Sequence, residues 1–304
     1  MKNNNKKVSV IIPSYNHQNY VLKAIESVLD QDWPQIDLIV IDDGSTDASP
    51  KLLDNFHKER GGFRLFLNNY NKGLIKTLNE GLKLARGNFI CELASDDMLL
   101  QGSLAKRANY LLGHPETSVV FADAYHMFDS GKTQRRMMNK GKEGFCSDKH
   151  SVLDLLSGKA RILFATGMFT KEVLTDLGGF DEDFRYFEDI AMWFKLSIST
   201  RVGYLDEPVM YYRKHVSNTS SSQKLSVRQE KILALEKLLS LKPVGVVPSI
   251  KKALSREYQR YLKFALHNAV NTEEHAAVFR KARKLQPLSL KTWCYGMLAR
   301  KGFK

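Results

Sequence analysis

The stretch that decides the fold is Leu38-Ile39-Val40-Ile41-Asp42-Asp43-Gly44-Ser45-Thr46-Asp47, an apolar run followed by an acidic turn. The pattern recurs where Asn88-Phe89-Ile90-Cys91-Glu92-Leu93 leads into Ser95-Asp96-Asp97. Short apolar, β-branched runs that end in Gly, Ser and Asp are typical of buried parallel strands. Ligands of open α/β sheets bind beyond the carboxyl ends of such strands. The two acidic turns therefore predict a site that holds a sugar nucleotide through its hydroxyls, its base edge and a divalent metal.

Strands and helices alternate on both sides of these runs, through the first half of the chain. Strands that alternate with helices of about 10 to 15 residues predict parallel βαβ units, and so an α/β fold with a mostly parallel sheet. The expected strands are residues 7–12 (ended by Pro13), 37–41, 63–67, 89–93 and 118–122, and the expected helices are 20–29, 47–58, 72–86 and 103–112.

The alternation loosens after residue 122. We expect a loop or hairpin over 128–149, helices over 151–156 and 189–199, short strands over 202–205 and 209–212, and a linker over 217–222. Four apolar-basic helical stretches follow, at 226–241, 249–270, 273–285 and 289–300. The predicted organisation is one α/β domain over residues 1–222, with halves of about 1–123 and 124–222, and a helical extension over 223–304.

Composition limits the class of protein. No apolar run approaches the roughly 18 to 20 residues of a membrane span, and residues 1–7 are polar and basic, without the apolar core of a signal peptide. Three cysteines far apart suggest neither a disulfide framework nor a CxxC metal site. A cytoplasmic protein is expected.

The net charge of +13 is unevenly placed. Residues 1–222 carry 28 Lys+Arg and 28 Asp+Glu, whereas residues 223–304 carry 18 against 5. The whole basic excess lies in the last quarter, which suggests an extension that meets an anionic surface. Residues 249–270 are amphipathic, and Trp293 and Tyr295 lie among basic residues as in an interfacial helix. The alternative is a helical cap with a solvated basic face.

The acidic turns also have simpler structural interpretations. Gly44 could supply a turn and Ser45 or Thr46 a helix cap, which explains one carboxylate but not the adjacent pair Asp42 and Asp43. Asp96 and Asp97 could be the solvated start of a helix. However, adjacent carboxylates repel, and a hard divalent cation binds such oxygens together with phosphate oxygens. The positive charge of such a cation would neutralise a diphosphate leaving group as its bond to the sugar breaks.

Three further features complete the pattern. Asn71, Gly73, Asn79, Gly81 and Gly87 punctuate one helix, which is consistent with close packing on the sheet and with a site. Glu188 and Asp189 begin an apolar helix, where a carboxylate serves either as a partner of the helix dipole or as a general base for a sugar hydroxyl. His215 follows Tyr212-Arg213-Lys214 and is a weaker candidate.

Taken together, these motifs resemble the family 2 glycosyltransferases, which have the GT-A fold. The resemblance covers about residues 7–222 and not the C-terminal quarter. It is carried by the opening Val-Ser-Val-Ile-Ile-Pro-Ser-Tyr-Asn (Val8 to Asn16), Asp42 to Asp47, Asn71 to Gly87, Ser95-Asp96-Asp97, Gly178 to Glu182, and Glu188-Asp189, in family order and spacing.

The resemblance implies a role for each motif in an inverting single displacement. The nucleotide-sugar site would comprise Pro13, Tyr15, Asn16, Asp42, Asp43, Asn71, Gly73, Lys76 and Asp96. Asp97 and His215 would bind Mn²⁺ or Mg²⁺, Asp189 would be the base assisted by Glu188, and Gly179, Phe180, Asp181 and Trp193 would face the acceptor. Two departures stand out: Ala94 replaces an acidic residue that many relatives have, and Lys195 replaces an arginine, without its bidentate fork.

The resemblance implies transfer of a sugar to lipopolysaccharide core, O-antigen, capsule or a lipid-linked glycan. The donor remains open among UDP-hexose, UDP-N-acetylhexosamine and dTDP-rhamnose. We expect the protein to be peripheral on the inner face of the cytoplasmic membrane, through residues 223–304. A catalytically silent sugar-nucleotide binder is the alternative. A nucleic-acid-binding protein is disfavoured, because it leaves the acidic turns unexplained.

Overall fold

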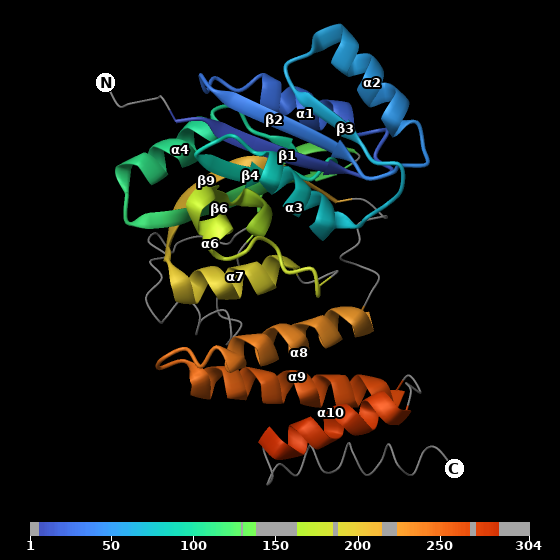
Figure 1. Ribbon diagram of the computed structural model, residues 1–304, viewed down its shortest axis with the longest axis vertical. Coiled ribbons are helices and arrows are strands. Elements are labelled where there is room, and N and C mark those ends of the chain that lie inside the picture. Colours follow the sequence, from blue (N-terminus) through green and yellow to red (C-terminus); the bar gives the residue numbers. More distant parts are fainter. Residues whose placement is uncertain are drawn as a thin grey trace. The chain divides into compact units, whose positions relative to one another are not determined.

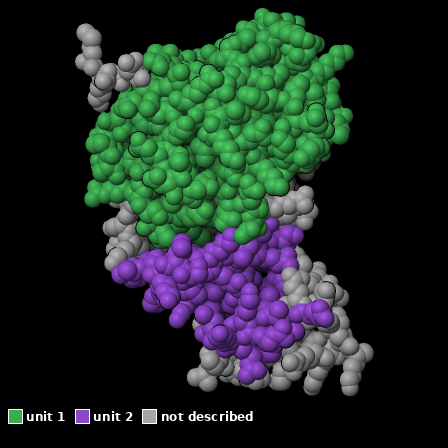
Figure 2. Space-filling view, in the orientation of Figure 1, with its two compact units in different colours: residues 1–151, 161–218 green, residues 152–160, 219–304 purple. Residues whose placement is uncertain are grey.

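A computed structural model of the chain describes residues 6–128, 130–137, 163–184, 188–214, 224–267 and 272–285. The chain divides into two compact units, coloured separately in Figure 2. The first comprises residues 1–151 and 161–218, and the second comprises 152–160 and 219–304. No helix among the described residues is long and apolar enough to span a membrane.

The first unit is built on one nine-stranded sheet (Figure 1). Its order is β3-β2-β1-β4-β8-β6-β9-β5, with β7 paired to β6. Strands β3, β2, β1 and β4 are mutually parallel, as are β6 and β9, whereas β8, β5 and β7 pair antiparallel to their neighbours. The strands are β1 (Val8–Ser14), β2 (Ile36–Asp42), β3 (Arg64–Leu67), β4 (Phe89–Glu92), β5 (Met98–Leu99), β6 (Thr117–Phe128), β7 (Gly131–Arg136), β8 (Met168–Thr170) and β9 (Arg201–Lys214).

The predicted alternation of strands and helices in a mostly parallel sheet is confirmed. The helices of this unit are α1 (Val21–Leu29), α2 (Ser49–Arg60), α3 (Leu74–Leu84), α4 (Ser103–Gly113), α6 (Lys171–Asp176) and α7 (Glu188–Ser199), with a 3₁₀ turn at Phe164–Thr166. Side chains alternate across β1 as the pleat requires. Val10 and Ile12 join one hydrophobic cluster with buried residues of α1, α2 and α4, while Ile11 meets α3 on the opposite face.

Two strand predictions were wrong. β1 does not end at Pro13 but continues to Ser14, paired with β2. The missing N–H of Pro13 removes no ladder bond to β4, because the β1–β4 pairing extends only to Ile11. The segments 202–205 and 209–212 are one strand, β9, since bulges opposite Ala122 and Asp123 absorb the intervening residues.

The second unit contains α8 (Lys224–Ser240), α9 (Val247–His267) and α10 (Thr272–Leu285). α9 packs between α8 and α10 (Figure 1). It buries the apolar stripe expected over 249–270, including Ile250, Leu254 and Leu262. Buried Glu257 pairs with Lys231 and Arg260. The expected elements at 151–156, 217–222 and 289–300, with Trp293 and Tyr295, lie outside the described residues.

Gly81 sets how closely α3 approaches the sheet. A Cβ atom at Gly81 would lie 2.4 Å from Cγ2 of Ile11, a fully packed side chain. We expect Gly81→Ala to lower the free energy of unfolding by about 1–3 kcal/mol in urea titrations, because overpacking outweighs the helix propensity of alanine. Gly113→Ala, where a Cβ meets nothing within 4 Å, is the matched control and is expected to be neutral or stabilising. Equal stability of both variants would contradict this account of the packing.

Candidate functional site

The turns that follow β1 and β2 are joined by hydrogen bonds. The N–H of Asn16 donates to Oγ of Ser45 (2.8 Å), and the N–H of Thr46 donates to Oδ1 of Asn16 (2.8 Å). Asn16 adopts a left-handed φ of 54°, which asparagine tolerates better than most residues. The two predicted nucleotide-binding turns therefore form one structure, in which the Asn16 amide has a connecting role.

Asp42 ends β2 and is fully buried. Its carboxylate accepts hydrogen bonds from the N–H of Ser45 (2.9 Å) and the Oγ of Ser45 (2.7 Å). Burial raises the pKa of Asp42, and the bonds from Ser45 offset only part of that rise. This carboxyl is therefore held in place but poorly compensated in charge.

Asp43 fixes the loop between β3 and α3. Its carboxylate accepts from Nδ2 of Asn68 (3.0 Å) and from the N–H groups of Lys72 (3.0 Å) and Gly73 (2.8 Å). The loop lies so close that a Cβ on Gly44 would be 2.4 Å from the carbonyl carbon of Tyr70. The carboxylate of Asp43 thus holds the backbone at the start of α3.

Asp96 and Asp97 follow β4 and contact a buried arginine from β9. The N–H of Arg213 donates to Oδ1 of Asp97 (2.8 Å), and Nε of Arg213 donates to the carbonyl oxygen of Asp96 (2.8 Å). Asp97 is 2% exposed. Burial, followed by the neighbouring Asp96 charge, raises the pKa of Asp97 well above its ordinary value, although Arg213 opposes the shift.

The sequence analysis assigned no role to Arg213 or to His17. The guanidinium of Arg213 lies over the ring of Tyr20, 4.6 Å from its centroid. Nδ1 of His17 is 2.7 Å from Oγ of Ser95, which joins the turn after β1 to the turn after β4. The only signal for Arg213 is its place in the Tyr-Arg-Lys-His stretch next to His215, because its partners are 116 and 117 residues away.

The Gly178–Glu182 loop is attached to the middle of α3. Nδ2 of Asn79 donates to the carbonyl oxygen of Phe180 (2.9 Å), and the N–H of Phe180 donates to Oδ1 of Asn79 (2.9 Å). Gly179 has a φ of 73°, and a Cβ there would lie 2.7 Å from Oδ1 of Asn79. The sequence marked Asn79 as part of a punctuated helix, but its bonds to Phe180, 101 residues away, were not predicted.

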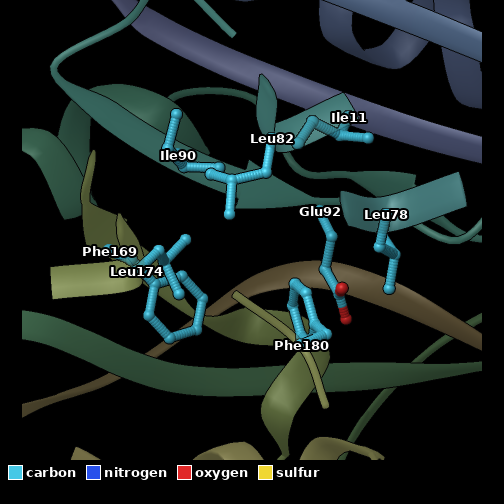
Figure 3. A pocket seen from close by; sticks show the side chains of 8 residues that line it. All are labelled: Ile11, Leu78, Leu82, Ile90, Glu92, Phe169, Leu174 and Phe180. Carbon is cyan, nitrogen blue, oxygen red and sulfur yellow. The ribbon is translucent and has the colours of Figure 1, made fainter. Parts of the chain in front are cut away.

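Phe180 closes a small cavity between α3, β4 and α6, with Glu92 as its single charged side chain (Figure 3). Its volume of about 10 Å³ holds at most about one water molecule. The lining residues are Ile11, Leu78, Leu82, Ile90, Glu92, Phe169, Leu174 and Phe180. The cavity is too small for a sugar, so it reflects how the loop packs on the sheet.

The remaining predicted residues occupy different environments. Tyr15 is 43% exposed, Asn71 and Lys76 are exposed, and Pro13, Gly73, Asp181 and Asp189 are half-buried. Trp193 is 1% exposed, and its ring packs edge-on against Phe121. The structure therefore gives Trp193 a packing role. Glu188 is the first residue of α7, and His215 lies outside the described residues.

The donor atoms near Asp97 suit a hard divalent cation in type. Among the described residues there is no cluster of three or more His, Cys, Asp or Glu side chains able to hold a metal. Asp97 nevertheless offers carboxylate oxygens beside Asp96, and burial, followed by the Asp96 charge, raises its pKa, which a bound cation would oppose. Hard cations held by one or two carboxylates take their other ligands from substrate phosphates and water, so this donor set fits such an ion.

Comparisons with known proteins agree with this geometry. A family model described as "Glycosyl transferase family 2" matches residues 9–169. The chain is 32% identical over 196 residues to the GalNAc(5)-diNAcBac-PP-undecaprenol beta-1,3-glucosyltransferase of Campylobacter jejuni, a match that covers 62% of this chain. The matched segment spans 59% of that relative's length.

Solved structures share the fold. S. aureus TarS (residues 1–349, in complex with UDP-GlcNAc) matches with a TM-score of 0.69 at 18% identity, covering 97% of this chain and 92% of that one. The mannosyltransferase PcManGT from Pyrobaculum calidifontis, in complex with GDP-Man and Mn²⁺, matches with a TM-score of 0.58 at 18% identity, covering 97% and 86%. The predicted GT-A fold is thereby confirmed.

The raised pKa of Asp97 predicts a specific pH dependence of stability. Because the folded-state pKa lies above the unfolded value of about 4, the free energy of unfolding falls as the pH rises from that value towards the folded pKa. We expect Asp97→Asn, measured in EDTA by urea unfolding, to be more stable than the parent at pH 7. The difference should shrink as the pH approaches 4.

Asp37 provides the matched control at the opposite end of β2. Burial alone would raise the pKa of Asp37. Hydrogen bonds from the Ser9 hydroxyl, the N–H of Arg86 and the Arg64 guanidinium outweigh this effect, so the pKa is lowered overall. Its stabilisation is present above pH about 4 and is lost as the pH falls through the folded pKa. Asp37→Asn should therefore destabilise the chain at pH 7, by about 1–3 kcal/mol. A loss of stability in both variants would refute the contrast.

Proposed function

The chain belongs to glycosyl transferase family 2, and we propose that it moves a sugar from a nucleoside diphosphate sugar to a hydroxyl of a bacterial surface or lipid-linked glycan, with inversion. The observation that carries this proposal is the convergence of four buried carboxylates, Asp42, Asp43, Asp96 and Asp97, at the carboxyl ends of β2 and β4. Such an edge is where α/β sheets bind their ligands.

The donor nucleotide is proposed to lie against the joined turns after β1 and β2. The exposed ring of Tyr15 offers a stacking surface. The Asp42 carboxylate, whose two oxygens accept from Ser45, would take a further hydrogen bond from a base or ribose. Asn16 and Asp43 act indirectly, since their side chains already hold Thr46 and the start of α3. Asn71, Gly73 and Lys76 line the same side, with Lys76 exposed for contact with phosphate.

The diphosphate is proposed to lie beside Asp97. Asp97, with His215 as a second ligand, would hold Mn²⁺ or Mg²⁺, and Asp96 would contact ribose or phosphate. When bound, the metal neutralises charge on the diphosphate as its bond to the sugar breaks. The N–H of Arg213 fixes the Asp97 carboxyl by one oxygen, and the guanidinium of Arg213 adds positive charge nearby. The bound Mn²⁺ of the Pyrobaculum enzyme supports this assignment.

Asp189 is proposed as the general base, with Glu188 assisting. It would take the proton of the acceptor hydroxyl, whose oxygen attacks the anomeric carbon while the bond to the diphosphate breaks on the opposite side. Asp189 lies half-buried in the first turn of α7. Gly179, Phe180 and Asp181 would position the acceptor, because Asn79 fixes the backbone of Phe180 on both sides.

A uridine nucleotide is the proposed donor moiety, carrying a hexose or an N-acetylhexosamine; dTDP-rhamnose is the alternative. UDP-GlcNAc bound to TarS supports this choice. The undecaprenol-linked substrate named for the Campylobacter relative supports a lipid-linked acceptor. Such an acceptor agrees with peripheral binding of residues 223–304 to the anionic inner face of the cytoplasmic membrane, which their charge also favours.

Donor binding can be tested by thermal unfolding with UDP, dTDP, GDP and CDP, each with and without Mn²⁺. A ligand at 100 times its dissociation constant stabilises a protein by about 2.7 kcal/mol. We expect one nucleotide, UDP, to raise the melting temperature most, and Mn²⁺ to enlarge the shift. Asp97→Ala should remove the enlargement by Mn²⁺, whereas Asp176→Ala, an exposed acid on α6, should retain it. No shift with any nucleotide would contradict the donor site.

The base assignment can be tested with Asp189→Asn. Loss of a general base lowers turnover by about 10² to 10⁴, while the nucleotide-dependent melting shift should stay as in the parent, because Asp189 is assigned to the acceptor step. Asp176→Asn serves as the control and should keep full activity. Full transfer by Asp189→Asn would refute the assignment. No transfer by the parent with any UDP sugar or dTDP-rhamnose and a lipid-linked acceptor, despite nucleotide binding, would support a silent binder.

A further inference from the structure

We propose that the α8–α9 turn, residues 241–246, is the part of the second unit that inserts into an anionic lipid surface. The inference rests on the proposed membrane association and identifies the residues that make it. It does not depend on the transfer reaction, because none of these residues belongs to the candidate active site.

The turn presents two apolar side chains to solvent. Val244 is 81% exposed and Leu241 is 59% exposed, and they are the exposed large hydrophobic side chains among the described residues of the second unit. Val246, at the other end of the turn, is buried. Val246 thus anchors the turn in the helical unit, while Leu241 and Val244 are exposed and could enter a membrane interface.

Positive charge surrounds these side chains. Residues 237–256 contain five Lys or Arg and no Asp or Glu. Lys242 lies within the turn, and Lys251 and Lys252 follow in the first two turns of α9, all three exposed. Within the described part of the chain, no ion pair or hydrogen bond involves the ammonium group of any of these three lysines.

Two acidic residues of α8 and α9, Glu236 and Glu257, are engaged away from the turn. Glu257 is 4% exposed and pairs with Arg228, Lys231 and Arg260. Glu236 pairs with Lys281 of α10 and accepts a hydrogen bond from the hydroxyl of Tyr258. The packing of the three helices therefore uses these two carboxylates internally and leaves Lys242, Lys251 and Lys252 available to an external anion.

Backbone angles and hydrogen bonds define the conformation of the turn. Lys242 and Gly245 have left-handed φ angles of 47° and 76°. The N–H of Lys242 donates to the carbonyl oxygen of Leu239 (3.1 Å), and that of Ile250 donates to Val246 (3.0 Å). A preorganised turn loses little conformational entropy on binding, and the start of α9 adds the partial positive charge of a helix N-terminus.

An anionic bilayer matches both properties at once. Its headgroups attract Lys242, Lys251 and Lys252, and its acyl boundary receives Leu241 and Val244. A soluble polyanion uses only the charges. The contribution of the two apolar side chains therefore distinguishes a lipid surface from other anionic partners.

The experiment is sedimentation of the full chain with vesicles of phosphatidylcholine, with and without phosphatidylglycerol. The parent should bind only the anionic vesicles. Leu241→Ser with Val244→Ser should lower the partition coefficient about tenfold, and Lys242→Asn with Lys251→Gln and Lys252→Gln should lower it about a hundredfold. Asparagine is chosen at position 242 because it tolerates the left-handed backbone. On a heparin column, the apolar pair should elute with the parent and the lysine triple earlier.

Matched controls remove the same side chains elsewhere. Lys23→Gln with Lys51→Gln and Lys83→Gln takes three exposed lysines from α1, α2 and α3, and Leu67→Ser takes an exposed leucine from β3. Both controls should bind vesicles as the parent does, and unchanged melting temperatures will show that all variants fold. Unaltered vesicle binding by both turn variants would overturn the proposal, as would equal binding of the parent to neutral vesicles. The UDP melting shift, measured in parallel, reports separately on the proposed function.

Discussion

The burial of four carboxylates at one edge of a parallel sheet is the constraint on which the rest of this structure depends. A buried carboxylate is costly unless hydrogen bonds or opposite charge compensate it. The loop before α3 donates hydrogen bonds to Asp43, while Ser45 and Arg213 of β9 offset only part of the cost of burying Asp42 and Asp97. Each compensation fixes a different segment of the chain. Hydrogen bonds of Asn16 with Ser45 and of His17 with Ser95 join these segments to the turn after β1.

Helix α3 links the turn after β2 to the Gly178–Glu182 loop. The N–H of Gly73, just before the helix, donates to Asp43, and Asn79 holds both backbone groups of Phe180. Six residues at the helical rise separate these points by about 9 Å. Gly81 then allows α3 to lie directly on Ile11 of β1. In the proposed function, donor and acceptor sides would share one rigid helix, so their spacing would follow from helix geometry rather than from loop conformation.

The sequence predicted what depends on local pattern. The strands ending at Asp42 and at Glu92, and the glycine punctuation of α3, are such features, because a buried strand and a closely packed helix have recognisable residue types. Contacts between distant segments were not predictable in this way. Arg213 donates a hydrogen bond to Asp97, which lies 116 residues away in the sequence. Asn79 donates to Phe180, which lies 101 residues away. Trp193, predicted to face the acceptor, is buried and packs against Phe121. Its role toward the acceptor stays a prediction, because an aromatic residue on an apolar helix does not reveal which of its sides is covered.

The pairing of charged side chains within each unit suggests what that unit binds, and the two units differ in the sign of the charge that remains. Buried carboxylates pair with nearby Lys and Arg side chains, and the charged groups that stay without a partner determine what the surface can bind. In the first unit Asp96 and Asp97 lie side by side in a buried turn, and burial and the neighbouring Asp96 charge raise the pKa of Asp97, a setting in which a divalent cation would stabilise the charged carboxylates. In the second unit Glu236 and Glu257 are satisfied internally and Lys242, Lys251 and Lys252 remain, which suits an anionic surface. The even charge balance of residues 1–222 and the excess of +13 in residues 223–304 thus correspond to two different kinds of proposed partner, a soluble nucleotide sugar and a lipid surface, and a lipid-linked acceptor is the substrate that would require both.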